Sequence, residues 1–96
     1  MSTHAVVWSS DGGRTSGRLE SFSDRFELIG RDRRLTLLFS DLVGMTIARD
    51  RAERLLGMPV LALERRDGDS VRIAALEGPG LLHDLAARIE QGREAT

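Results

Sequence analysis

The sequence predicts a mainly β (α+β) domain in which about seven short strands are followed by one C-terminal helix. Turn-forming residues recur at short intervals, and between them apolar and polar residues mostly alternate, which is typical of half-buried strands. From residue 81 the apolar spacing changes to that of an amphipathic helix. A chain of 96 residues is near the common size of one domain, so we expect residues 1–96 to form a single unit.

The first three predicted strands form a hairpin meander. Their ranges are 5–8, 14–21 and 25–29. Serine, aspartate and glycine residues between them supply the turns. Phe26 and Leu28 share one face of the third strand, while charged residues share the other. Trp8 ends the first strand, where it is either a core residue or a contact residue on an exposed edge.

Four more strands are expected. The fourth presents one face with Leu35, Leu37 and Phe39, and the fifth presents one face with Val43, Met45 and Ile47. The sixth and seventh cover 60–66 and 71–76. Asp67, Gly68 and Asp69 join them, and an Asp-Gly pair between alternating runs is a strong hairpin signal.

An amphipathic helix closes the chain. Its apolar positions are Leu81, Leu82, Leu85, Ala86 and Ile89. Pro79 is acceptable in a first helical turn, and Gly92 lies where a left-handed C-cap would end the helix. Residues 50–56 fit either a short helix or an ordered loop, because Gly57 and Pro59 limit a helix there to about two turns.

The order of elements and three segments resemble bacterial pleckstrin-homology-like (PH-like) and GRAM-like domains. GRLESFSDRFELIG is similar to their second and third strands, LTLLFSDLVGMTI to the next pair, and GLLHDLAARI to their closing helix. The resemblance implies a partly open barrel of two near-orthogonal antiparallel sheets, capped by the C-terminal helix. Two small sheets must in any case bury their apolar faces on each other. The alternative is an α+β sandwich with the helix flat on one sheet.

The composition argues against several classes of protein. All 14 basic residues are arginine, and 15 interleaved acidic residues leave a net charge of −1, so little field attracts nucleic acid or an anionic membrane. Without cysteine there is no disulfide or thiolate metal site, and no cluster of histidine and carboxylate has ligand spacing. We therefore expect no metal and no cofactor. No signal-peptide pattern or membrane-length apolar run is present, so a cytoplasmic protein is expected.

We expect no catalytic activity. His4 and His83 are the two histidines, and nucleophilic catalysis would need one beside a serine and oriented by a carboxylate. Asp84 follows His83, but helical neighbours point about 100° apart, so adjacency gives no dyad.

The resemblance also implies one candidate ligand site. PH-like domains that bind inositol phosphates carry basic residues around the barrel end opposite the helix. The corresponding positions here are Arg14, Arg18, Arg31, Arg33 and Arg66. The same loops carry Asp11, Asp32, Asp67 and Asp69, which oppose the local field. The alternative interpretation is a solvated rim whose charges cancel.

We therefore expect a noncatalytic PH-like module for protein association. Self-association as a homodimer is included, through an edge strand or the faces containing Trp8 and Leu38. The alternative is binding of an anionic ligand or a phosphorylated lipid headgroup by the arginine-bearing loops. Nucleic acid is not an expected partner, because base stacking needs exposed aromatic residues among basic ones.

Overall fold

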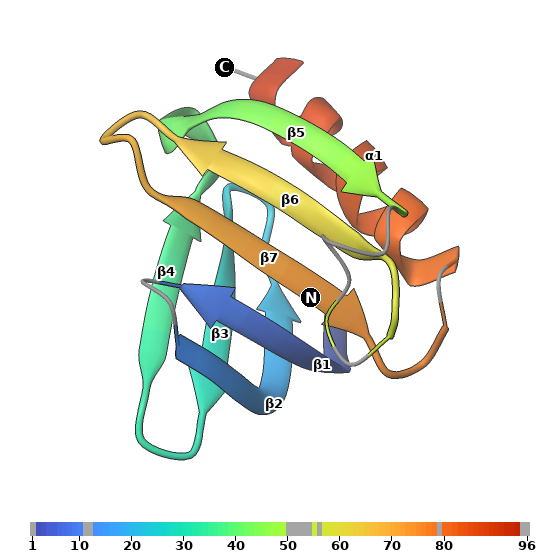
Figure 1. Cartoon of the computed structure of the whole chain (residues 1–96). Helices are drawn as coiled ribbons and strands as arrows, with labels where there is room; N and C mark the ends of the chain where they lie inside the picture. Colours follow the sequence, from blue (N-terminus) through green and yellow to red (C-terminus); the bar gives the residue numbers. More distant parts are fainter. Residues whose placement is uncertain (1, 11–12, 50–54, 56, 79, 95–96) are drawn as a thin grey trace.

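Seven antiparallel strands form one curled sheet, a half-barrel, and one helix closes it (Figure 1). The structure is a computed structural model that describes residues 2–10, 13–49, 55, 57–78 and 80–94. The strands are β1 (Ser2–Ser10), β2 (Gly13–Ser21), β3 (Arg25–Gly30), β4 (Arg34–Leu38), β5 (Leu42–Ala48), β6 (Val60–Arg65) and β7 (Ser70–Ala75). A short 3-10 turn, η1 (Phe39–Asp41), precedes β5, and the helix is α1 (Gly80–Glu94).

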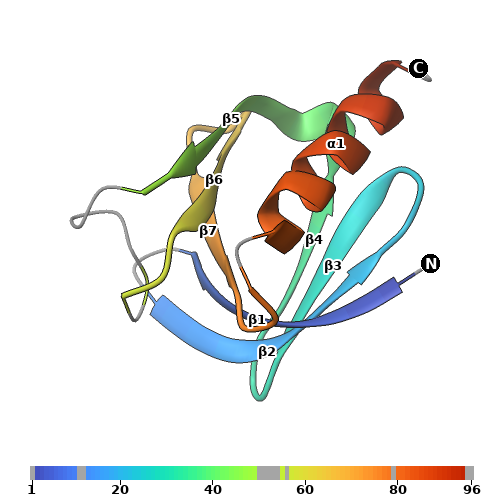
Figure 2. The ribbon, with the colours of Figure 1, turned by 90° about the vertical axis from the view of Figure 1, so that its right-hand side faces the viewer.

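The strand order in the sheet is β4-β3-β2-β1-β7-β6-β5. Every neighbouring pair is also consecutive in sequence except β1 and β7. Residues 6–10 of β1 pair with both β2 and β7, so β1 joins the two halves into one continuous sheet. The sheet curls around α1 instead of lying flat beneath it (Figure 2). The predicted mainly β fold, with a partly open barrel and a helical cap, is confirmed, and β4 and β5 are its free edges.

The core lies on the concave face of the sheet. Phe26 and Leu28 are fully buried there, as their alternation with charged residues predicts. The ring of Phe39 meets that of Phe26 edge to face, with 4.9 Å between centroids, a favourable arrangement for aromatic pairs. Phe39 lies in η1 and not in β4 as predicted, but it is buried as expected. From the helix, Leu82, Leu85 and Ile89 complete this core.

Trp8 belongs to this core and is only 1% exposed. The contact-surface alternative for Trp8 is therefore wrong. The reason is the central position of β1, whose neighbours β2 and β7 leave Trp8 no free edge.

Val43 does not share the core face with Met45 and Ile47, and that prediction is wrong. The pairing of β5 with β6 shifts register between Leu42 and Gly44, so Val43 is the extra residue of a β-bulge. The bulge changes the phase of the alternation, which lets both Leu42 and Met45 face the core and leaves Val43 55% exposed.

The helix does not end at Gly92, and the predicted C-cap is wrong. α1 continues to Glu94, and Gly92 is not among the described glycines with positive φ. A Cβ at position 92 would overlap the ring of Phe39 and lie 2.9 Å from the carbonyl oxygen of Ser23. Glycine is needed here because the helix approaches η1 closely.

A second, smaller apolar cluster lies on the convex face. Val7, Val60 and Ala74 are buried there beneath Leu55 and Met58. Leu55 and Met58 exchange two main-chain hydrogen bonds of 3.1 and 2.9 Å in a tight turn. The expected helix or loop at 50–56 otherwise lies outside the described residues. No helix in the described part of the chain is long and apolar enough to cross a membrane.

Candidate binding surfaces

The first candidate surface is the arginine-bearing rim, the end of the half-barrel that carries Arg14, Arg18, Arg31 and Arg33. Arg33 Nη2 donates to the carbonyl oxygen of Ser10 at 3.0 Å, and its guanidinium carbon lies 5.2 Å from the centre of the Trp8 ring. These contacts hold the β3–β4 loop against the end of β1. Arg14, at the start of β2, and the β3–β4 loop with Arg31 and Arg33 therefore lie at one end of the half-barrel.

The rim arginines differ in what they contact. Arg33 is already bound to Ser10 and Trp8, and exposed Arg18 pairs with Glu20 at 3.3 Å. The side chains of Arg14 and Arg31 are exposed, and neither guanidinium makes a hydrogen bond or ion pair within the described part of the chain. Two of the five candidate arginines, Arg14 and Arg31, therefore keep uncommitted guanidinium groups.

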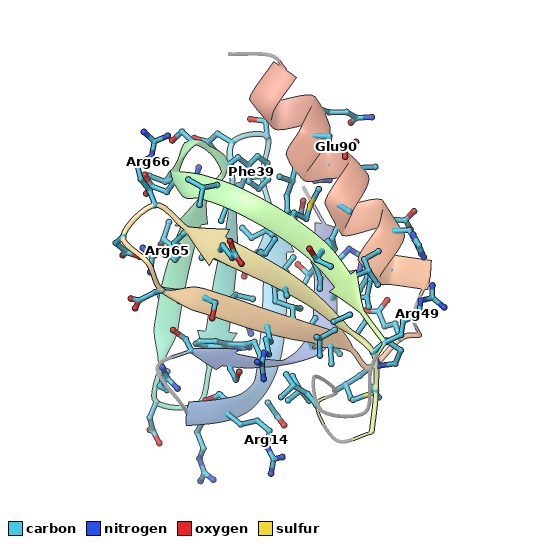
Figure 3. All side chains as sticks on the ribbon, turned by 45° about the horizontal axis from the view of Figure 1, so that its top comes forward. Arg14, Phe39, Arg49, Arg65, Arg66 and Glu90 are labelled. Carbon is cyan, nitrogen blue, oxygen red and sulfur yellow. The ribbon has the colours of Figure 1, made fainter. Side chains whose placement is uncertain are left out.

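Arg66 is separate from this group. Its Nη2 donates to the carbonyl oxygen of Ser40 in η1 at 3.0 Å, so it lies beside η1 and away from Arg14 (Figure 3). In the neighbouring turn, Asp67 accepts from the amide of Asp69 at 3.0 Å and lies 3.9 Å from Arg65 Nη2. The carboxylates of this turn offset its positive charge.

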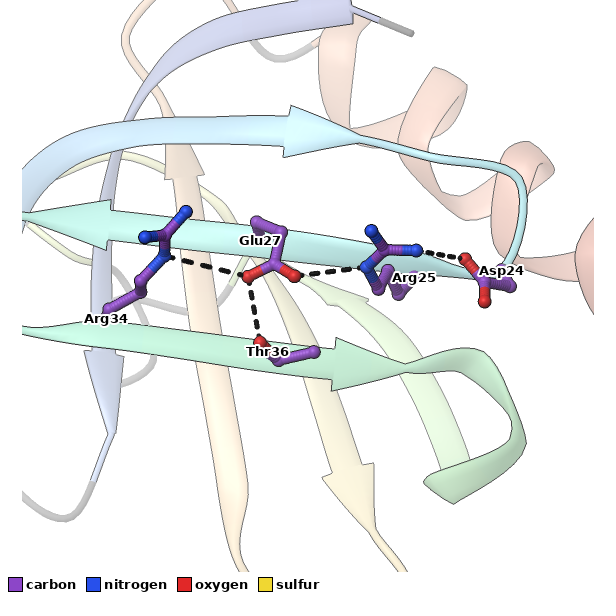
Figure 4. Close-up of polar contacts among 5 residues, drawn as sticks. All are labelled: Asp24, Arg25, Glu27, Arg34 and Thr36. Atoms are coloured by element: carbon purple, nitrogen blue, oxygen red, sulfur yellow. Dashed lines mark hydrogen bonds and ion pairs between the residues drawn. The ribbon is translucent and has the colours of Figure 1, made fainter.

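The outer face of β3 and β4 is covered by a polar network centred on Glu27 (Figure 4). The carboxylate accepts from Thr36 Oγ1 at 2.8 Å and from Arg25 Nε at 3.0 Å, with Arg34 Nε 3.9 Å away. Burial raises the pKa of Glu27, but the hydrogen bonds from Thr36 and Arg25 outweigh it and hold that pKa below its ordinary value. The charged side chains of this network, Glu27, Arg25 and Arg34, lie beside the free edge of β4.

The second candidate surface is the free edge of β5. No charged residue occurs from Leu42 to Ala48, whereas the shorter β4 begins with Arg34. Monomeric proteins usually protect a sheet edge with charges, proline, bulges or a short strand. In β5 the bulge at Val43 protects only the beginning of the strand. Among the described residues, the rest of β5 has no strand paired on this side.

The hydrogen-bond pattern shows which groups of β5 face this edge. The amide of Arg65 donates to the carbonyl of Asp69 across the β6–β7 turn, so Arg65 directs its main chain toward β7. Alternation along β6 then directs every second residue from Glu64 toward β5. Their partners in β5 are Gly44, Thr46 and Ala48. Met45 and Ile47 therefore point their N–H and C=O groups away from the sheet.

A hollow of about 570 Å³ follows the same strand. Residues 44–49 line it together with Ala62 and Glu64 of β6, and none of its lining residues comes from α1. Gly44, Thr46, Ala48 and Ala62 alternate toward its convex side and are small, and the side chain of Glu64 lies against Gly44 on the same side. The hollow leaves room for side chains of an added strand.

The helix flanks β5 on the concave side. At one end, Arg49 Nη2 lies 3.3 Å from Nε2 of His83 in the first part of α1. At the other end, Gly92 packs on Phe39 just before β5 begins. The helix and β5 therefore run side by side in opposite directions (Figure 3).

A second hollow, of about 380 Å³, lies between α1 and the start of β1. His4 borders it and places Nδ1 3.4 Å from Oε1 of Glu77. The amide of Ala5, at 2.9 Å, and His4 lower the pKa of Glu77. Within the described residues, no group of three or more histidines and carboxylates could hold a metal ion.

Sequence reasoning missed the β5 edge, although one signal for it was present. The uncharged run LVGMTIA is plain in the sequence. Its place at the edge depends on the pairing of β1 with β7, which joins strands more than 60 residues apart. Local alternation carries no information about such a pairing.

These features define a class of protein by architecture: a seven-stranded antiparallel half-barrel with a C-terminal helical cap. No family model matches the chain, and no curated protein does. A solved structure similar to it is the C-terminal domain of an unknown protein from Leishmania infantum, with a TM-score of 0.73 and 6% identity. The match covers 93% of this chain and 82% of that one. At this identity the likeness shows the fold alone.

Proposed function

We propose that this chain is a noncatalytic PH-like module that binds a protein partner by strand addition at the β5 edge. The observation that carries the proposal is the pair of outward-facing main-chain positions, Met45 and Ile47, in an uncharged edge strand. The PH-like assignment is supported by the order of seven strands and a closing helix. The absence of catalysis remains a prediction from the sequence.

Strand addition supplies affinity through the main chain and specificity through side chains. An antiparallel partner would form two N–H···O bonds at each of Met45 and Ile47. Each such bond contributes about 1 kcal/mol net, so the four together contribute about 4 kcal/mol, which only matches the lower end of the cost of association. The partner must therefore also use the hollow beside Gly44 and Thr46, where Glu64 excludes acidic side chains.

The proposal is tested by selecting extended peptides from a random displayed library on the immobilised protein. A selected peptide added to the labelled protein is expected to shift the amide resonances of Met45 and Ile47. N-methylation of the peptide at its bonding amides should weaken binding about fivefold per lost bond, since each is worth about 1 kcal/mol. Shifts confined to residues 13–14 and 31–33 would instead contradict strand addition at β5.

Binding of an anionic ligand is the second candidate function. It is favoured by the convergence of the loops at Arg33 and by the uncommitted groups of Arg14 and Arg31. It is opposed by the engagement of Arg18 and Arg33 and by the exposed carboxylate of Asp32 beside them. Titration with inositol phosphates and with anionic vesicles separates the two functions, because anion binding would shift Arg14 and Arg31 and leave Met45 and Ile47 unchanged.

A further inference from the structure

The β5 edge is complementary to itself when two copies run in opposite directions. We infer that the strand added at this edge is β5 of a second copy, with the Thr46 residues of both copies beside a two-fold axis. The inference rests on the proposed function, because it requires the β5 edge to accept a strand. It goes further by naming the partner and the register.

The main chain fixes this register. Only Met45 and Ile47 in the regular part of β5 direct N–H and C=O groups outward, so they must form the hydrogen-bonded pairs. An antiparallel dimer uses both outward positions of both copies only when Met45 of each copy faces Ile47 of the other, so this register forms the most hydrogen bonds. Four main-chain hydrogen bonds form, and the arrangement closes on itself as an isologous contact.

The side chains fit the same register. Thr46 faces Thr46 across the axis, and threonine pairs are favourable neighbours on adjacent strands. Gly44 faces Ala48, so no large side chain crowds the two threonines. On the concave side, Met45 and Ile47 already pack against the main core and are only half-buried. Pairing them with Ile47 and Met45 of the second copy would extend that core.

The charges at the two ends of β5 also match. Asp41 precedes the strand and Arg49 follows it. Antiparallel pairing brings the acid of one copy toward the base of the other at both ends, whereas parallel pairing would bring like charges together. Asp41 is the last residue of η1 and directly precedes β5, and Arg49 directly follows it, so both charges lie at the ends of the paired strands. Arg49 also contacts His83, and a guanidinium has five N–H donors to share.

The other free edge lacks these properties. β4 carries Arg34, and its middle residue, Thr36, donates to Glu27 of the neighbouring strand. Two copies paired through β4 would bring this charged network together on both sides. The uncharged edge is therefore the one suited to a second copy.

Sedimentation equilibrium over a wide range of concentration tests the inference. The weight-average mass of the intact chain is expected to rise from 10.6 kDa toward twice that value. Thr46→Lys places two ammonium groups opposite each other at the axis and should abolish the rise. Thr36→Lys is the matched control, because Thr36 is also an exposed threonine in the middle of an edge strand. A monomer at every concentration, or loss of association in the control alone, would overturn the inference.

A charge exchange tests the register independently of that variant. Asp41→Arg and Arg49→Glu should each weaken self-association, because each places like charges at both ends of the paired strands. Mixed in equal amounts, the two variants should associate again, since every contact then joins opposite charges. Circular dichroism melting of each variant confirms that it is folded. Failure of the mixture to associate, with both variants folded, would overturn the register.

The outcomes separate this inference from the proposed function. If the chain stays monomeric but selected peptides still shift the amides of Met45 and Ile47, the second copy is ruled out and strand addition stands. If the peptides shift neither amide, both the proposed function and this inference are contradicted.

Discussion

Gly92 of α1 lies directly against the ring of Phe39, and this contact fixes the C-terminal end of the helix on the sheet. Phe39 is buried and stacks edge to face on Phe26 of β3. The helix therefore rests on an aromatic pair that belongs to both η1 and the sheet. A residue chosen by sequence pattern as a helix stop is in fact a point of close packing.

We predict that Gly92→Ala destabilises the protein. Alanine gains about 1 kcal/mol over glycine inside a helix, but the added methyl group would overlap Phe39, and overpacking costs about 1–3 kcal/mol. The expected net loss is about 1 kcal/mol in the free energy of unfolding, measured by urea denaturation.

Gly80→Ala is the control for this change. Gly80 begins the same helix, and no atom lies within 4 Å of its added Cβ. We expect this variant to be neutral or slightly stabilised. If Gly92→Ala were stabilised like the control, the close approach of α1 to Phe39 would be wrong.

We predict that Glu27 contributes stability that is lost in acid. Because its folded pKa lies below the unfolded value, the contribution is present above about pH 4.3, the ordinary pKa of glutamate. It disappears as the pH falls through the lower folded pKa. Glu27→Gln should cost about 1 kcal/mol at neutral pH and flatten the acid limb of the stability curve. Equal acid sensitivity in Glu27→Gln and wild type would contradict this role.

We predict that Arg33 stabilises the rim by contacting Trp8 and Ser10. Arg33→Met removes a hydrogen bond and a cation–π contact, each worth about 1 kcal/mol or less. The melting temperature should fall, and the emission of Trp8, the one tryptophan in the chain, should change. Arg31→Met should leave both unchanged. A larger effect at Arg31 than at Arg33 would show that the contacts of Arg33 do not hold this loop.

The sequence predicts well those features that local alternation controls. The buried face of β3, with Phe26 and Leu28, and the buried stripe of α1, with Leu85 and Ile89, follow from period alone. Prediction from the sequence fails at Val43, where one extra residue shifts the alternation of buried and exposed side chains. It also fails at Gly92, where a contact with the distant Phe39 explains the glycine. Both errors concern pairings that no short stretch of sequence encodes.

For the candidate surfaces too, the sequence shows the residue types but not where packing places them. Arginines in turns are visible in the sequence, but the engagement of Arg33 by Ser10 and Trp8 depends on how two distant loops pack. The uncharged strand around Thr46 is visible too, but its edge position follows from the pairing of β1 with β7. Long-range strand pairing therefore sets the limit of sequence reasoning for this chain.

Amide hydrogen exchange along β5 in dilute protein tests the central claim most directly. The account predicts slow exchange at Thr46 and Ala48, which pair with β6, and fast exchange at Met45 and Ile47, which face the free edge. Raising the protein concentration should then protect Met45 and Ile47 without changing Thr46. Protection of Met45 and Ile47 in the dilute protein would contradict the account, because it would mean that this edge is already covered.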